Sequence, residues 1–259
     1  MRQDTLMALF EQLLPISREA GAAIMDIYQQ EDFAAQLKAD ASPVTAADLA
    51  AHHVLLAALT PLLPDCPVVS EEDEASLCHR LATGRFWLID PLDGTKEFLA
   101  RNGEFTVNIA LIENGCPILG VVYAPAIDAL YWGGKTLGAW RKANGNTVAI
   151  SVAAADVCRV VASKSHLNDA TRNFINSLGK HELVQAGSSL KLCRVAEGSA
   201  DIYPRLAPTC EWDTAAAHAV VEGAGGLVVD TQGNTLVYGK TDVLNPSFIV
   251  TRDAGLIPA

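Results

Sequence analysis

Residues 86–95, with the sequence FWLIDPLDGT, join an apolar run to two carboxylates, a proline, a glycine and a hydroxyl. The run 86–89 predicts a buried strand, and Asp90 and Asp93 come at its end. An unpaired buried charge is very costly, so carboxylates at such a place need a partner. A hard divalent cation bound by oxygen atoms is a suitable partner. The stretch therefore predicts a metal site at the end of a buried strand.

The composition is that of a globular protein with a packed core. The chain has 259 residues, of which 50% are hydrophobic and 19% are charged. This length suits one large domain or two modest ones. The formal net charge of −11 argues against binding of nucleic-acid polymers, which favours a basic surface. Small anionic ligands stay compatible with it, because bound metal ions reverse the charge of a site locally.

The sequence predicts a cytoplasmic protein without a membrane span. Its six cysteines form no Cys-x-x-Cys pair and have no zinc spacing, which favours reduced thiols. The first 14 residues contain Asp4 and Glu11 and lack the apolar region of a signal peptide. The uncharged stretch 49–64 contains two histidines and two prolines, so we do not expect it to cross a bilayer. Peripheral contact with the inner face of the membrane, and a monomer or a homodimer, all fit these observations.

The first half of the chain, residues 1–152, is predicted to contain helices followed by a sheet. Apolar spacing predicts a helix over 5–28, which Pro15 bends or interrupts. A second helix is predicted to start at Pro43 and to end at Pro61 and Pro64. The strands that follow, with a hairpin at 113–115, predict a largely antiparallel sheet, and their ranges are 67–70, 86–89, 105–112, 118–123, 129–132, 138–141 and 147–152.

The second half, residues 153–259, is predicted to alternate strands with helices. Such alternation is typical of an α/β sandwich. We expect the two halves to pack closely, with the functional site between them. The predicted strands are 159–162, 182–185, 201–203 and 227–229, and the predicted helices are 168–178, 189–197 and 212–222.

The stretch 90–95 can present both of its carboxylates to one pocket. Pro91 pushes Asp90 toward an extended conformation, which leaves the Leu92 carbonyl free to face a cation. Gly94 permits close backbone approach, and residues 94–98 could open a helix whose N–H groups cradle a phosphate. A turn with a helix N-cap is the competing interpretation. The whole stretch after an apolar strand is more specific than an isolated Asp-x-x-Asp.

Three further carboxylates are candidates for the same site. Glu71 follows the short strand 67–70, whereas its neighbours Asp73 and Glu74 are typical of a solvated turn. Asp48 and Asp213, each taken alone, are typical of first-turn carboxylates that stabilise a helix N-terminus. Taken together, these acidic positions predict a magnesium site for phosphoryl transfer, with more than one ion.

Four segments resemble, in order, the sequence pattern of the inositol monophosphatase superfamily: Asp48, 71–72, 90–95 and 212–216. These enzymes are lithium-sensitive, magnesium-dependent phosphomonoesterases, and the resemblance covers essentially the whole chain. It implies one unit over residues 1–259, folded as a layered αβαβα sandwich. It also implies two or three magnesium ions, held by Glu71, Asp90, the Leu92 carbonyl, Asp93 and Asp213. Asp48, Thr95 and Glu71 are the implied catalytic residues, with Thr95 and Asp48 readying the attacking water.

Within the superfamily, segments 94–98, 101–108, 187–191 and 203–205 are similar to those of bacterial 3′(2′),5′-bisphosphate nucleotidases. The similarity implies removal of the 3′-phosphate from adenosine 3′,5′-bisphosphate, or from 3′-phosphoadenylyl sulfate, in sulfur assimilation. The implied substrate contacts are Gly94, Thr95, Ser163, His166, Gly187, Lys191, Arg205 and Asp213.

Three of these contacts have other interpretations. Alone, His166 is more typical of a surface histidine, and Lys191 of a solvated helix lysine. Arg205 fits a phosphate clamp and a plain salt bridge equally. An inositol or other sugar-phosphate phosphatase is the alternative enzyme, and a nucleotide-sensing scaffold is the alternative without catalysis.

Overall fold

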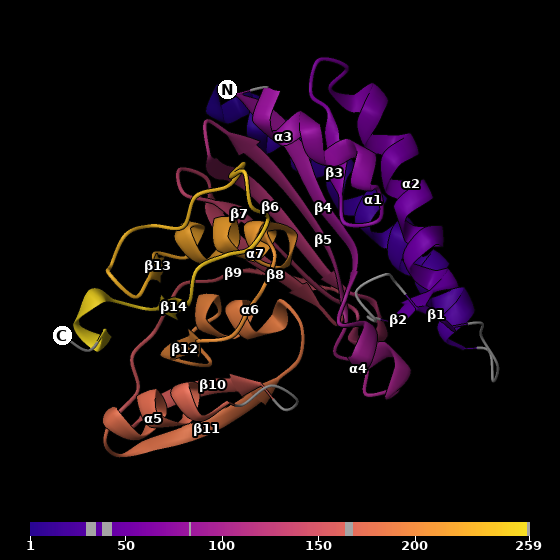
Figure 1. Cartoon of the computed structure of the whole chain (residues 1–259). Coiled ribbons are helices and arrows are strands. Elements are labelled where there is room, and N and C mark those ends of the chain that lie inside the picture. The colour runs from indigo at the N-terminus through magenta and orange to yellow at the C-terminus, as the bar shows by residue number, and fades with distance from the viewer. Residues whose placement is uncertain (30–34, 38–42, 83, 164–167, 258–259) are drawn as a thin grey trace.

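The computed structural model has two large β-sheets that alternate with three layers of helices (Figure 1). Helices α1 and α2 cover one face of a seven-stranded sheet, and α6 and α7 lie between the two sheets. Helix α5 covers the outer face of the five-stranded sheet. This αβαβα order confirms the predicted fold class. The structure describes residues 1–29, 35–37, 43–82, 84–163 and 168–257. The helices of these layers are α1 (Gln3–Tyr28), α2 (Ala46–Leu62), α5 (Asp169–Ser177), α6 (Leu190–Ala196) and α7 (Glu211–Gly223).

The strands of the seven-stranded sheet follow one another in chain order from β3 to β9. Every neighbouring pair is antiparallel except β3 and β4, which confirms the prediction of a largely antiparallel first half. The predicted hairpin is present, with Asn114 and Gly115 both at positive φ as a tight hairpin turn requires. The strands are β3 (Val68–Ser70), β4 (Arg85–Asp93), β5 (Thr106–Glu113), β6 (Cys116–Ala124), β7 (Ala129–Gly134), β8 (Gly138–Ala143) and β9 (Asn146–Ala149).

The five-stranded sheet has the order β11-β10-β12-β14-β13. Strand β10 is parallel to β11 and β12, in keeping with the predicted alternation of strands and helices. Strand β14 is antiparallel to both of its neighbours and is absent from the sequence-based prediction. The strands are β10 (Cys158–Ser163), β11 (His181–Ala186), β12 (Ile202–Arg205), β13 (Leu227–Asp230) and β14 (Phe248–Thr251).

The remaining elements are short. Strands β1 (Ala35–Leu37) and β2 (Pro43–Thr45) form a separate antiparallel pair. The prediction of a helix start at Pro43 is therefore wrong by three residues, since α2 begins at Ala46. The short helices are η1 (Glu74–Cys78), α3 (His79–Ala82), α4 (Thr95–Leu99), η2 (Pro125–Ile127) and η3 (Ala254–Leu256).

Two prolines lie inside helices rather than ending them. Helix α1 continues through Pro15, and α2 continues one residue past Pro61. A proline inside a helix removes one backbone hydrogen bond, so tertiary packing must compensate. In α1 the side chains of Leu13 and Ile24, which precede and follow Pro15 in the sequence, are fully buried in the core, and this packing stabilises the helix.

Strand β4 is buried on both faces, because successive side chains alternate between two cores. Trp87 and Ile89 belong to the core beneath α1 and α2. Phe86 and Leu88 belong to the core that the seven-stranded sheet shares with α6 and α7. The same alternation directs Asp90 toward α6 and α7, so the end of the strand faces the interior of the sandwich.

Helix α7 lies directly against the seven-stranded sheet because Gly120 of β6 has no side chain. A Cβ at Gly120 would lie 2.0 Å from the carbonyl oxygen of Ala216. All but three residues of α7 are buried, which is typical of a helix between two sheets. This contact fixes where the first turn of α7, and with it Asp213, stands relative to β4.

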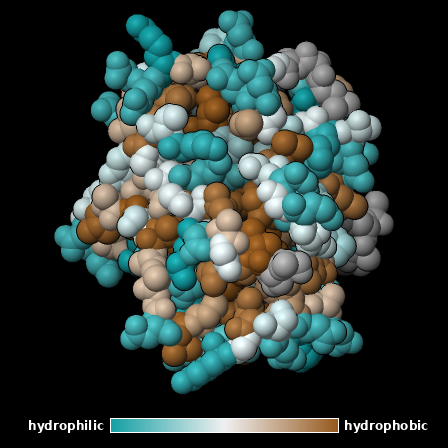
Figure 2. Space-filling view, turned by 90° about the vertical axis from the view of Figure 1, so that its left-hand side faces the viewer, coloured by the Kyte–Doolittle hydropathy of each residue, from teal (hydrophilic) through white to brown (hydrophobic). Residues whose placement is uncertain are grey.

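One face of the molecule has hydrophobic residues across its middle and lower part, between hydrophilic margins (Figure 2). Within the described part of the chain, no helix is both long enough and apolar enough to cross a membrane. All six cysteines are free thiols, as predicted.

Candidate metal centre and substrate cleft

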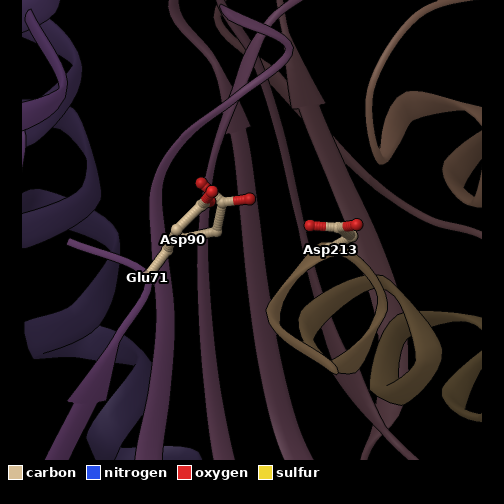
Figure 3. Close-up of side chains that lie close together, drawn as sticks. All are labelled: Glu71, Asp90 and Asp213. Carbon is tan, nitrogen blue, oxygen red and sulfur yellow. The ribbon is translucent and has the colours of Figure 1, made fainter. Parts of the chain in front are cut away.

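Three carboxylates from three elements meet at one edge of the seven-stranded sheet. Glu71 follows β3, Asp90 lies in β4, and Asp213 lies in the first turn of α7. Each offers an oxygen atom, and these atoms all lie within 4.8 Å of one another. Figure 3 shows Glu71 and Asp90 side by side, with Asp213 facing them from its helix. The parallel pairing of β3 and β4 brings the first two together, since the carboxyl ends of parallel strands meet at one edge.

A β-bulge aims Asp90 and Asp93 into the same cleft. Asp90 is opposite Asn108 of β5, and Asp93 is opposite Thr106, so β4 has one residue more than β5 over this stretch. Residues three apart on a regular strand face opposite sides, but one extra residue brings Asp93 back to the side of Asp90. Leu92 accordingly packs into the core beneath α1 and α2. Pro91 is tolerated inside a central strand because it lies at this bulge.

The carboxylates raise one another's pKa. Burial raises the pKa of Asp90 well above its usual value, and the charges of Glu71, Asp93, Asp213 and Asp48 add to the effect. Burial and the charges of Asp93 and Glu71 likewise raise the pKa of Asp213. Burial also raises the pKa of Asp93, to about 6, although the Lys191 ammonium opposes the shift. Such a cluster of like charges is stable in its ionised form only beside a cation.

The donor set suits a hard divalent metal ion. Asp90 is 1% exposed, and its Oδ2 atom has no hydrogen-bond partner within the described residues. Its other carboxylate oxygen accepts a hydrogen bond of 3.1 Å from the Leu92 backbone N–H. Asp90 thus has one carboxylate oxygen held by a hydrogen bond and one that is available to a ligand. With Glu71 and Asp213 beside it, the site offers the oxygen ligands that magnesium and calcium bind. The residues present therefore fit a divalent metal.

The carboxylates form one wall of a cavity of about 260 Å³. Nine of the predicted site residues line it: Glu71, Asp90, Leu92, Asp93, Gly94, Thr95, Lys191, Arg205 and Asp213. Two others, Asp48 and Gly187, are not among its lining residues. Asp48 is buried in the first turn of α2, and its negative charge reaches Asp90. A Cβ at Gly187 would lie 2.8 Å from the Glu104 carbonyl oxygen, so this glycine permits close packing.

Two remaining predicted contacts belong to the segment at the end of β10. Ser163 is the last residue of that strand, and its backbone is paired with Ala186 of β11. His166 lies outside the described residues.

Gly94 and Thr95 form the corner between β4 and α4. Gly94 has a φ of +94°, in the left-handed region that favours glycine, and it precedes the helix as its N-cap. Thr95 is the first residue of α4, so the predicted opening of a helix at this point is confirmed. The turn lets the chain leave the strand sharply and places both residues on the cavity wall.

Lys191 and Arg205 form a basic part of the cavity lining, the basic wall. Lys191, in the first turn of α6, is 8% exposed, and burial lowers its pKa. Its Nζ atom lies 5.9 Å from the centre of the Tyr203 ring, within cation–π range. Interpreting Lys191 as a solvated helix lysine is therefore wrong, because α6 is enclosed between the two sheets.

Arg205, at the end of β12, is the second cation of this wall. Its Nη2 atom donates to the Pro208 carbonyl oxygen at 3.0 Å. Its Nε atom is buried without a hydrogen-bond partner within the described residues. No carboxylate there lies within 4.0 Å of its guanidinium, although the charge of Arg205 lowers the pKa of Asp213 against the larger effect of burial. Among the described residues, Arg205 thus does not form the plain salt bridge that was one of its two interpretations.

Several lining residues were not assigned by the sequence reasoning. Tyr203 and Ser188 lie within segments that carried the family resemblance, which was a usable signal. Phe248 lies in β14, and its apolar run Phe248–Val250 could have indicated a strand. Lys96 and Glu97 favour a nucleotidase in the sequence but have no predicted role in the site, and both line the cavity. The other lining residues without a predicted role are Ser188, Leu192, Tyr203, Thr209, Thr214 and Phe248.

Comparisons with known proteins agree over nearly the whole length of the chain. A model of the inositol monophosphatase family matches residues 8–257. The 3′(2′),5′-bisphosphate nucleotidase CysQ of Salmonella typhimurium is 50% identical over 245 residues, which cover 94% of this chain and 99% of that protein. The protein of the same name from Escherichia coli K12 is 49% identical over the same shares of the two chains.

Solved structures agree with the sequence comparisons. The crystal structure of CysQ from Bacteroides thetaiotaomicron superposes with a TM-score of 0.84 at 40% identity, covering 97% of this chain and 98% of that one. An inositol monophosphatase from Anabaena gives a TM-score of 0.74 at 25% identity, covering 97% and 93% of the two chains.

Proposed function

The chain belongs to the inositol monophosphatase family, and we propose that it hydrolyses adenosine 3′,5′-bisphosphate to AMP and inorganic phosphate. This makes it a phosphoric monoester hydrolase of the 3′(2′),5′-bisphosphate nucleotidase type, the activity named for relatives about half identical to it. 3′-Phosphoadenylyl sulfate, which carries the same 3′-phosphate, is a second substrate under this proposal. The role that follows is removal of this nucleotide during sulfur assimilation.

One observation carries the choice of a bisphosphate. The cavity is lined by the carboxylate cluster and also by two cations, Lys191 and Arg205, and neither cation forms an ion pair within 4.0 Å with a carboxylate of the described residues. A substrate with one phosphate needs only the metal-binding wall. A substrate with two phosphates has a second anionic group, and Lys191 and Arg205 suit it, since arginine binds phosphate oxygens in a bidentate manner.

Members of this family are metal-dependent phosphatases, and we propose magnesium, with two or three ions at the acidic wall. The residues that would hold them are Glu71, Asp90, the Leu92 carbonyl, Asp93 and Asp213. When bound there, magnesium lowers the pKa of water and neutralises charge on the phosphate. The structural support is the carboxylate cluster itself, together with the buried Asp90 oxygen that has no hydrogen-bond partner in the described part of the chain.

Thr95, at the corner of β4 and α4, acts on the attacking water together with Asp48 and Glu71. We assign the Thr95 hydroxyl to orient this water and the buried Asp48 carboxylate to accept its proton through Thr95, with Glu71 holding the water from the metal side. The water oxygen forms a bond to phosphorus as the bond to the ribose 3′-oxygen breaks, and the 3′-oxygen leaves as a hydroxyl group after taking up a proton from solvent. The backbone of Gly94 would contact the transferred phosphate, because no side chain separates it from the cavity.

The second half of the chain supplies the nucleotide side. By similarity, Ser163, His166 and Gly187 join Lys191, Arg205 and Asp213 in contacting the substrate. The six free thiols fit a reducing compartment, so we place the activity in the cytoplasm.

The test compares phosphate release from adenosine 3′,5′-bisphosphate and from inositol 1-phosphate at saturating magnesium. We expect kcat/KM to favour the bisphosphate at least about tenfold, since one charged hydrogen bond contributes about 1.5–3 kcal/mol. A preference for inositol 1-phosphate would identify a sugar-phosphate phosphatase instead. Binding of the nucleotide without phosphate release from either compound would identify a nucleotide-sensing scaffold.

A further inference from the structure

Two polar residues of β5 lie directly opposite the two carboxylates of β4. Thr106 is the cross-strand neighbour of Asp93, and Asn108 is that of Asp90. Both are buried, at 0% and 1% exposure, in a central strand whose other side chains are apolar apart from its last residue. Neither lines the cavity. These two polar side chains therefore lie behind the acidic wall rather than on it.

The side chains of Thr106 and Asn108 bind to the start of α6, which comes from the other half of the chain. The Ser189 hydroxyl donates to Asn108 Oδ1 at 2.8 Å. Thr106 Oγ1 lies 2.8 Å from Ser189 Oγ and 3.3 Å from Ser188 Oγ. Because Ser189 donates its proton to Asn108, Thr106 is the donor toward both serines, and its one hydroxyl proton is shared between Ser189 Oγ and the more distant Ser188 Oγ. A continuous chain of hydrogen bonds thus joins β5 to the α6 N-terminus.

The same serine also holds a carboxylate of the acidic wall. The backbone N–H of Ser189 donates to the Asp93 carboxylate and lowers its pKa, against the larger effect of burial. Two residues further along α6, Lys191 stands on the basic wall. Ser189 therefore contacts Asp93 directly and lies two residues before Lys191 in α6.

Backbone strain at this point agrees with a positioning role. Ser188 has a φ of +42°, in the left-handed region that non-glycine residues rarely adopt. Such strain persists only where the surroundings determine the conformation, and it clusters at functional sites. The contact of Ser188 with Thr106 and the bonds of its neighbour Ser189 are the interactions that hold this turn.

Stability alone does not account for the choice of these residues. Replacing a buried hydrogen-bonded pair by apolar groups of the same shape is nearly neutral. A buried network of hydrogen bonds instead specifies one arrangement of the groups that it joins. Of the side-chain polar atoms in this network, only Asn108 Nδ2 has no hydrogen-bond partner within the described residues. Here the groups joined are the strand behind the carboxylates and the helix that carries Lys191.

We propose that Thr106, Asn108 and Ser189 form a clasp that positions the Asp93 carboxylate for metal binding and sets α6 against it. These are positioning residues, since none of them faces the cavity. The inference rests on the metal-dependent activity proposed above, and goes beyond it by naming what aligns the two halves of the site. The residues that hold a metal ligand in place change metal affinity or activity by about 10- to 100-fold when altered.

The test uses the full chain with Thr106→Val and Ser189→Ala, which remove one hydroxyl each, and Thr106→Ser, which restores it. Calorimetric titration with Mg²⁺ in the absence of substrate measures metal affinity, and kcat, KM and the melting temperature are measured alongside. We expect the Thr106→Val and Ser189→Ala dissociation constants for Mg²⁺ to rise about tenfold, and Thr106→Ser to recover most of the loss.

Matched controls separate positioning from stability. Thr251→Val and Ser17→Ala also remove a hydroxyl from a residue that is 0% exposed, at places outside the cleft. They should lower the melting temperature without changing Mg²⁺ affinity. Clasp variants that lose stability as the controls do, and bind Mg²⁺ as the parent does, would overturn the proposal.

The outcome for the clasp is separable from that for the proposed function. A parent protein that binds Mg²⁺ but leaves the bisphosphate intact contradicts the proposed activity, while the clasp is still judged from the Mg²⁺ titrations. A parent that binds no Mg²⁺ contradicts both. If Thr106→Val does not fold, Ser189→Ala decides, because it removes a single oxygen atom and keeps the backbone N–H that Asp93 accepts from.

Discussion

The two walls of the cleft have opposite charges and come mainly from opposite halves of the chain. Glu71, Asp90 and Asp93 belong to the first half, whereas Lys191 and Arg205 belong to the second. Asp213 is the exception. It belongs to the second half, but α7 packs against the seven-stranded sheet of the first half and places Asp213 beside the other carboxylates. Neither half contains a complete site. We therefore propose that residues 1–259 fold as one unit rather than as two independent domains.

The opposite charges of the two walls indicate that they bind different groups. The acidic wall is a set of like charges with raised pKa values, so it needs cations to stay ionised. The basic wall has two cations at the ends of different elements, so it suits an anionic group of the substrate. Substitutions on the first wall should then affect the metal and the chemical step, and those on the second should affect substrate affinity.

The largest effect is expected from Asp93→Asn on the acidic wall. The amide keeps the shape of the side chain but loses the negative charge that a metal ion needs. We expect kcat to fall by about 100-fold or more, because the change touches a proposed ligand directly rather than its support. Steady-state kinetics over a range of Mg²⁺ concentrations measures this, and thermal denaturation checks the fold.

Asp93→Asn should not destabilise the metal-free protein. Removing one of several buried like charges relieves repulsion, so the melting temperature without metal should stay the same or rise. Turnover close to that of the parent at saturating Mg²⁺ would refute the assignment of Asp93 to the metal.

Lys191→Met on the basic wall should give a smaller effect of a different kind. Methionine fills a similar volume without charge, so the variant loses a charged contact worth about 1.5–3 kcal/mol. We expect KM for the bisphosphate to rise about 10- to 100-fold, with the Mg²⁺ concentration needed for half-maximal activity unchanged. Initial rates measured against both substrate and Mg²⁺ separate these two quantities.

Adenosine 3′-phosphate sharpens this comparison, because it lacks the second phosphate. If Lys191 binds that group, Lys191→Met should lose little activity on the monophosphate. An equal loss of activity on both nucleotides would mean that Lys191 contacts the transferred phosphate. The acidic and the basic wall would then bind the same phosphate.

The acidic wall was predictable from the sequence and the relation between the walls was not. Asp90 and Asp93 stand in a local pattern with Pro91 and Gly94, and the turn into α4 was expected from those residue types. The bulge was not predicted, because the predicted strand ended at residue 89 whereas β4 continues to Asp93. Lys191 looks like a surface lysine in the sequence, since only the placement of α6 between two sheets buries it. The roles of Thr106 and Asn108 depend on contacts more than 80 positions away along the chain, which no local pattern encodes.

The smallest effect on activity is expected from His218, which lies on α7 but on neither wall. It is 0% exposed, and its Nδ1 atom lies 2.8 Å from the Tyr238 hydroxyl. Burial, with a contribution from the charge of Lys135, lowers its pKa to about 3. The folded protein therefore keeps His218 neutral, while the unfolded chain takes up a proton below pH 6.5.

Since the unfolded state then binds more protons, the stabilisation that neutral His218 provides is complete above pH 6.5 and falls as the pH is lowered toward 3. The loss approaches about 1.4 kcal/mol per pH unit in that window.

The variant His218→Asn keeps a hydrogen-bond partner for Tyr238 and cannot titrate. The difference in unfolding free energy between parent and variant therefore reports on His218 alone. The carboxylates, whose raised pKa values change stability in the opposite direction, contribute equally to both proteins. Urea denaturation at pH values between 7 and 4 gives that difference. We expect it to shrink as the pH falls, while kcat/KM at pH 7 stays within about twofold of the parent, because an interior residue of α7 touches neither the metal-binding carboxylates nor the substrate. A difference that is constant with pH would mean that His218 titrates in the folded state as it does in the unfolded chain.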